Sequence, residues 1–66
     1  MEITLNGEER QVPEGTTLTQ LIEGLGLSRF PYAAELNRQL VPRQDHQTTI
    51  LQSGDAIEVV TFVGGG

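Results

Sequence analysis

The final apolar run of the sequence reads AIEVVTFV, from Ala56 to Val63, and it decides the fold. Only Glu58 and Thr61 interrupt its apolar character, which is typical of a strand in the middle of a sheet. A late strand in mid-sheet needs a neighbour from early in the sequence. We expect that neighbour to be the first strand.

The beginning of the chain predicts a β-hairpin. Residues 2–5, EITL, alternate polar and apolar side chains, as a half-buried strand does. The dipeptide Asn6-Gly7 that follows is a strong signal for a type I′ turn. Residues 8–12 are therefore expected to form the returning strand.

A single helix is expected over residues 17–25. Thr17 and Gln20 have the spacing of a capping box, and Gly26 is well placed to end the helix. The apolar residues lie at i, i+3, i+4 and i+7, which forms one stripe: Leu18, Leu21, Ile22 and Leu25.

The second half predicts two short strands, over residues 33–37 and 39–41, around Asn37-Arg38. Residues 42–47 are expected to be polar loop or a single turn, and residues 48–51 a brief strand or extended piece. With one helix to cover one face, this order predicts an α+β domain. It has one mixed sheet of four to five strands and spans residues 1–63, followed by a flexible glycine tail at 64–66.

The predicted core consists of apolar residues at strand and helix positions: Ile3, Leu5, Val12, Leu18, Leu21, Ile22, Leu25, Leu36, Leu40, Ile50, Leu51, Ile57 and Val59. If Ile57 and Val59 face the helix, Val60 and Phe62 lie on the opposite face and are partly exposed. An exposed apolar pair beside the tail suggests a surface that docks onto a partner. The alternative is that Phe62 folds against the sheet as ordinary packing.

Composition narrows the classes of function. The 66 residues suffice for one domain and include no cysteine, so neither disulfides nor thiolate chemistry is available. The formal charge of −5 argues against nucleic-acid binding and suits a partner with a basic surface. No stretch is apolar enough to span a membrane or to act as a secretion signal, so a cytoplasmic location is expected.

The side chains offer little chemistry. His46 is the only histidine, and a lone loop histidine is expected to be a solvated surface residue, with no second ligand at metal spacing. Ser28 and Ser53 have no histidine placed by the sequence to activate them. We therefore expect no enzyme activity, no bound metal and no bound cofactor.

The glycines Gly64, Gly65 and Gly66 remain as the candidate reactive segment. A glycine tail has no side chain to obstruct entry into a narrow channel. A terminal carboxylate is ionised at neutral pH and a poor electrophile, so it must be activated, for instance as an acyl-adenylate from ATP. The alternatives are a frayed end or an engineered remnant.

These features together resemble the ThiS family, the ubiquitin-like sulfur carriers of thiamine biosynthesis. The resemblance covers nearly the whole chain. It rests on Leu36-Asn37, on Val41-Pro42-Arg43, on Gly54-Asp55 with the strand after it, and on the glycines. This chain departs from the family in having His46 where tryptophan is common, and three terminal glycines where two are usual.

The resemblance implies a β-grasp fold and a carrier that other enzymes act upon. An E1-like adenylating enzyme would use ATP to activate Gly66, and a cysteine-derived sulfur donor would convert it to a thiocarboxylate. Thiazole synthase would take the sulfur from the thiocarboxylate. Gly64 and Gly65 would form a flexible leash, that is, a narrow linker that lets Gly66 reach the active site of the enzyme. The free chain would be a monomer. Three alternatives remain: a carrier for molybdopterin synthesis or tRNA thiolation, a protein-conjugating modifier, and a ubiquitin-like binding module with an inert tail.

Overall fold

The computed structural model describes residues 1–62, so the predictions for Val63 and for the glycines at 64–66 lie outside the described residues. Its elements follow the predicted order. They are β1 (Glu2–Leu5), β2 (Glu8–Gln11), α1 (Leu18–Gly24), β3 (Tyr32–Leu36), β4 (Gln39–Leu40), a 3₁₀ turn η1 (Arg43–Asp45) and β5 (Ala56–Thr61). With 7 residues, α1 is far shorter than the roughly 20 needed to cross a bilayer, and no other helix of the described chain is long enough either.

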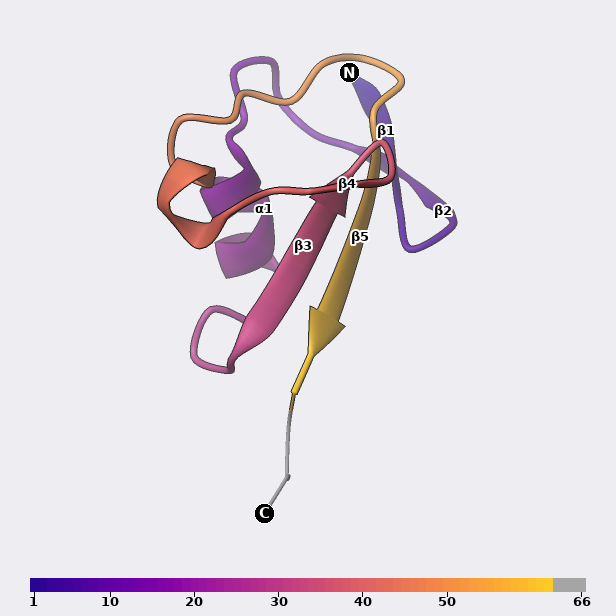
Figure 1. Cartoon of the computed structure of the whole chain (residues 1–66). Helices are drawn as coiled ribbons and strands as arrows, with labels where there is room; N and C mark the ends of the chain where they lie inside the picture. Colours follow the sequence, from indigo (N-terminus) through magenta and orange to yellow (C-terminus); the bar gives the residue numbers. More distant parts are fainter. Residues whose placement is uncertain (63–66) are drawn as a thin grey trace.

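The five strands form one mixed sheet in the order β2-β1-β5-β3-β4 (Figure 1). β5 runs parallel to β1 on one side and antiparallel to β3 on the other. The prediction of a central late strand beside the first one is therefore confirmed. A mixed sheet covered on one face by one helix is the expected β-grasp fold.

Both hairpins turn through residues with positive φ. Asn6 and Gly7 have φ of 50° and 84°, as a type I′ turn requires. The turn between β3 and β4 uses Asn37 and Arg38, with φ of 50° and 71°. Arg38 occupies a left-handed conformation that costs a non-glycine residue about 1 kcal/mol.

Hydrogen bonds close α1 at both ends. The Thr17 hydroxyl accepts from the Gln20 backbone N–H at 3.1 Å, and the Gln20 side chain accepts from the Thr17 N–H at 2.9 Å. At the other end Gly26, with φ of 75°, donates to the Glu23 carbonyl at 3.0 Å. The helix is one residue shorter at each end than predicted because the cap residues themselves are not helical.

The core lies between α1 and the sheet. Its buried members are Ile3, Leu5, Leu18, Leu21, Ile22, Ala34, Leu51, Ile57 and Val59. Val12, Leu25 and Leu36 are partly buried against them. Ala34 was not predicted, because its small side chain gives little signal in the sequence.

Two predicted core residues are wrong. Leu40 is 68% exposed and Ile50 is 56% exposed. Leu40 lies opposite Glu35 and therefore shares its face of the sheet, away from the helix. The segment at 48–51 makes a single bridge, between Thr17 and Ile50, and directs the next residue, Leu51, inward instead.

The prediction of a solvated His46 is also wrong, since this residue is only 3% exposed. Its Nε2 lies 2.8 Å from the Val41 carbonyl and its Nδ1 lies 3.3 Å from the Tyr32 hydroxyl. The 3₁₀ turn before it directs the ring inward, where it stacks on the ring of Tyr32. The loop then reaches the start of α1, because the Thr19 N–H donates to the His46 carbonyl at 3.2 Å.

Candidate functional site: the end of β5 and the open sheet face

The described chain ends at Phe62, one residue after the end of β5. Thr61 lies opposite Tyr32, and the Phe62 N–H donates to the Pro31 carbonyl at 2.9 Å. β3 therefore holds the backbone up to Phe62. The predicted site residues Gly64, Gly65 and Gly66 lie outside the described residues, and their roles remain predictions.

Asn6 holds the other side of β5. Its Oδ1 accepts from the Val59 N–H at 2.9 Å and its Nδ2 lies 3.3 Å from the Val59 carbonyl. β1 ends at Leu5, so this side chain continues the hydrogen bonding of the strand by one more residue. β5 is thus supported from both sides as far as Val59, and its last residues are supported by β3.

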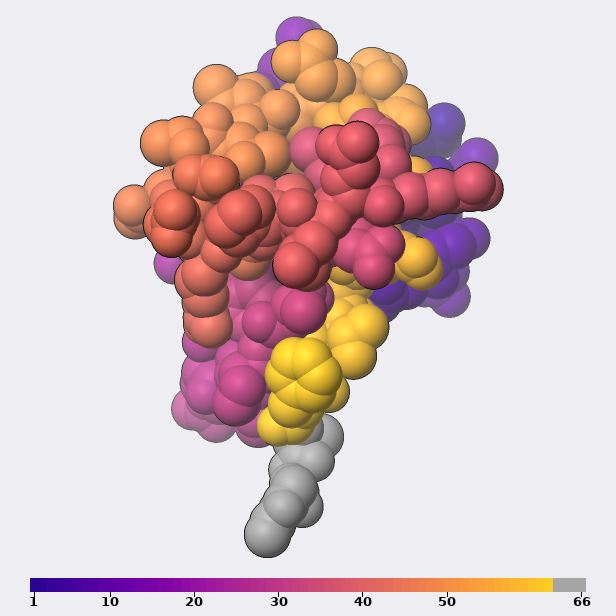
Figure 2. Space-filling view, in the orientation of Figure 1, coloured from indigo at the N-terminus to yellow at the C-terminus, as the bar shows by residue number. Residues whose placement is uncertain are grey.

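Val60 and Phe62 are exposed, as the sequence predicted, with 57% and 60% of their surface accessible. Val60 lies opposite Ala33 on the sheet face that points away from α1. The yellow end of β5 is visible at the molecular surface beside the magenta residues of β3 (Figure 2). The docking role of this pair remains a prediction.

The same open face is acidic. Glu35 of β3 lies directly opposite Glu58 of β5, and both are exposed. Glu2 and Glu9 lie on this face in β1 and β2, because Glu2 precedes the inward-facing Ile3 and Glu9 pairs with Thr4. Arg10 pairs with Ile3 and so lies on the helix side of the sheet. The face therefore joins an apolar end to a row of carboxylates.

Sequence reasoning missed this arrangement. Alternation within β3 and β5 would have placed Glu35 and Glu58 on outward faces, but it could not show that they are opposite each other. That depends on the register between strands more than twenty residues apart in the sequence. For the same reason the sequence did not predict the contacts of the Asn37 side chain. This side chain accepts from the Ala56 N–H at 2.9 Å and donates to Asp55 at 3.0 Å.

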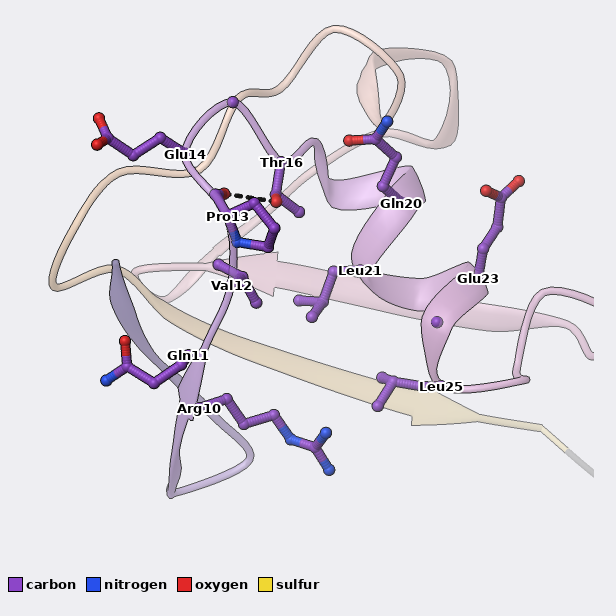
Figure 3. A pocket seen from close by; sticks show the side chains of 12 residues that line it. Arg10, Gln11, Val12, Pro13, Glu14, Thr16, Gln20, Leu21, Glu23 and Leu25 are labelled. Atoms are coloured by element: carbon purple, nitrogen blue, oxygen red, sulfur yellow. Dashed lines mark hydrogen bonds between the residues drawn. The ribbon is translucent and has the colours of Figure 1, made fainter.

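A separate open groove of about 930 Å³ lies between α1 and the segment after β2 (Figure 3). Val12, Leu21 and Leu25 form its apolar floor, and Arg10 and Glu23 lie at its rim. The Thr16 hydroxyl in this groove already donates to the Pro13 carbonyl at 2.6 Å. The groove therefore presents no activated nucleophile.

His46 and Arg43 are engaged in structural contacts. The hydrogen bonds of both His46 ring nitrogens go to Tyr32 and Val41, and the Arg43 guanidinium lies 4.3 Å from the centre of the Tyr32 ring. Within residues 1–62, no three histidine, aspartate or glutamate side chains gather as metal ligands would. Neither Ser28 nor Ser53 is a partner of His46. What the described residues do offer is an exposed apolar pair, Val60 and Phe62, beside the carboxylates of the open sheet face.

Known proteins with similar sequences include both large and small ones. The chain is 46% identical over 66 residues to a thiazole synthase from Magnetococcus marinus, and it spans only 20% of that protein. A thiazole synthase from Paramagnetospirillum magneticum is 35% identical and is likewise spanned over 20% of its length. The chain thus covers about a fifth of these two relatives. By contrast, it matches the sulfur carrier protein ThiS of Escherichia coli with 33% identity over 100% of both proteins.

The fold has a close counterpart among solved structures. The crystal structure of a thiamine biosynthesis protein (ThiS) from Geobacter metallireducens superposes with a TM-score of 0.82 at 31% sequence identity, covering 100% of both chains. The model of the ThiS family matches residues 2–66. The match in sequence and fold over this length shows that the chain belongs to the ThiS family.

Proposed function

We propose that this protein is a sulfur carrier of thiamine biosynthesis and that Gly66 carries the sulfur as a thiocarboxylate. The observation that supports this most strongly is the match to the sulfur carrier of Escherichia coli over the full length of both proteins. The β-grasp fold adds to it, because β5 leads from the centre of the sheet toward the glycines. The chain itself is the substrate of other enzymes in this proposal.

The chemistry converts the terminal carboxylate to a thiocarboxylate in three steps. In the first, the Gly66 carboxylate attacks the α-phosphate of ATP, forming an acyl-adenylate and releasing pyrophosphate. In the second, the terminal sulfur of a cysteine-derived persulfide attacks the carbonyl carbon, and the bond to AMP breaks. A thiol then cleaves the remaining S–S bond and leaves the thiocarboxylate on Gly66. An adenylating enzyme of the E1 type would supply the first step.

Within this proposal the chain contributes positioning rather than catalysis. The Phe62–Pro31 hydrogen bond fixes the position of the last described residue before the glycines. Gly64 and Gly65 would form a narrow leash, and three glycine residues extend up to about 10 Å. Val60 and Phe62 would contact the adenylating enzyme beside the entrance to its active site.

Thiazole synthase is the proposed acceptor of the sulfur. Two relatives with that name contain a segment similar to this whole chain. A segment within the same polypeptide is held at high effective concentration near its partner. The relationship supports a working association between this chain and a thiazole synthase.

The proposal is tested by the intact mass of the chain after incubation with ATP, sulfide and the adenylating enzyme of the same source. Exchange of one oxygen for one sulfur is expected, and a chain lacking Gly66 is the control. When the sulfide carries an isotopic label, transfer of that label into thiazole by thiazole synthase then establishes where the sulfur goes. An unchanged mass, with an enzyme proven active on another carrier, would contradict the proposal and favour a modifier or a binding module.

A further inference from the structure

Two like charges lie next to each other on the open sheet face. Glu35 and Glu58 are directly opposite in the antiparallel pairing of β3 and β5, where Cβ atoms are about 5 Å apart. Like charges in this position destabilise a sheet. The two carboxylates therefore do not stabilise the free chain, and their presence needs another explanation.

The surroundings of the pair do not neutralise it. On the same face, Glu35 has Leu40 across from it in β4 and Ala33 two residues away. Glu58 lies between Ala56 and Val60 along β5. None of these neighbours carries a positive charge, and Asn37, two residues after Glu35, is uncharged as well.

Charge is distributed unequally over the two sides of the sheet. Glu2, Glu9, Glu35 and Glu58 place four carboxylates on the open face, while Glu8 and Arg10 of β2 lie on the helix side and cancel in formal charge. Four formal negative charges thus share one face of a chain whose net charge is −5. A surface of opposite charge would be attracted to this side of the molecule.

Apolar residues flank the carboxylate pair on two sides. Val60 follows Glu58 by two residues along β5, toward the predicted tail, and Leu40 lies across from Glu35 in β4. Leu40, Val60 and Phe62 are each more than half exposed. A strand rises about 3.3 Å per residue, so Phe62 lies about 13 Å beyond Glu58 along the chain. An enzyme that receives the segment after Phe62 is thereby brought next to both the apolar residues and the carboxylate pair.

From this geometry we infer that the open sheet face docks onto the adenylating enzyme through an arginine or lysine that sits between Glu35 and Glu58. Apolar side chains of that enzyme cover Leu40, Val60 and Phe62, which together with the two glutamates form the docking face. A guanidinium can bond to two carboxylates at once, so binding relieves the repulsion present in the free chain. The inference rests on the proposed function, which supplies the partner.

The test compares two double variants with the same change in charge. Glu35→Gln with Glu58→Gln removes the pair, and Glu14→Gln with Glu23→Gln removes two exposed carboxylates at the groove on the helix side, as Figure 3 shows. ATP–pyrophosphate exchange by the adenylating enzyme gives KM and kcat for each chain. The face variant is expected to raise KM by at least about tenfold with little change in kcat, because the enzyme's cation is left unpaired.

Stability separates docking from folding. Removal of like charges should leave the face variant at least as stable as the parent in urea unfolding, so a higher KM cannot come from unfolding. The control pair should leave KM within about twofold, since rim charges act weakly.

Three outcomes overturn the inference. An equal rise in KM for both pairs would mean that net charge alone steers association, and no rise for the face variant would mean that the face is not used. If the face variant binds thiazole synthase more weakly while its KM for adenylation is unchanged, the face belongs to the interface with thiazole synthase instead. If the parent chain is not adenylated at all, the proposed function itself fails, which the parent measurement reveals separately.

Discussion

Asn6 bonds through its side chain to both backbone groups of Val59, 53 residues further along the chain. The turn of the first hairpin thereby fixes the strand that leads to the candidate site. The same residue occupies a left-handed conformation with φ of 50°, which glycine would adopt more easily. Two effects therefore oppose each other at this position, and a substitution can separate them.

Asn6→Gly should destabilise the domain by about 1–2 kcal/mol. Glycine relieves the backbone strain but removes two partly buried hydrogen bonds, each with a net contribution of about 0.5–1.5 kcal/mol. Urea unfolding gives the free-energy difference, and Asn6→Ala, which keeps the strain, should be worse. A glycine variant as stable as the parent would show that the bonds to Val59 contribute nothing.

Arg38→Gly should stabilise the domain by about 1 kcal/mol. Arg38 has φ of 71° in the turn between β3 and β4, and a Cβ is disfavoured in that conformation. Arg38→Ala is the matched control, since it removes the charge and keeps the Cβ. Thermal unfolding should show a higher Tm for the glycine variant alone. Equal shifts for both variants would attribute the effect to charge.

His46→Ala should destabilise the domain by about 2–3 kcal/mol, because it empties a buried position and removes hydrogen bonds to Val41 and Tyr32. Tyr32→Phe tests the hydroxyl contact by itself and should cost about 1 kcal/mol. In the double variant the two losses should not add, because they share one bond. Fully additive losses would mean that the contact at 3.3 Å carries no energy.

Gly65→Val should abolish adenylation in the mass assay while leaving the free energy of unfolding unchanged. On the proposed function, a branched side chain stiffens the leash and obstructs the channel of the enzyme. Ile57→Ala is the contrasting core variant, at a residue that is 1% exposed, and should cost about 2–5 kcal/mol. A stability loss for Gly65→Val as large as that of the core variant would refute the separation of tail from scaffold.

The sequence predicted the features that depend on near neighbours. The alternation in residues 2–5, the Asn6-Gly7 turn and the Thr17–Gln20 capping box involve residues a few positions apart, and all are present. The central place of β5 followed from its apolar character. These signals are local, so the sequence alone contains them.

What the sequence did not predict depends on contacts between distant segments. Leu40 was assigned to the core for its hydrophobicity, but its pairing with Glu35 places it on the open face. His46 was assigned to the surface for its polarity, but a 3₁₀ turn directs it toward Tyr32. The pairing of Glu35 with Glu58 likewise follows from the register of two strands, and no local pattern specifies it.

The position of β5 also bears on the order in which the protein is made and folded. The strand that joins β1 to β3 is synthesised after all the other described strands, so the sheet cannot close until it has left the ribosome. Closing the sheet requires contacts between the two ends of the described chain, which slows folding. Glu58, Val60 and Phe62 meet Glu35 only when β5 is in place. A partner that recognises this combination would therefore select molecules in which β5 has joined the sheet and pass over misfolded ones.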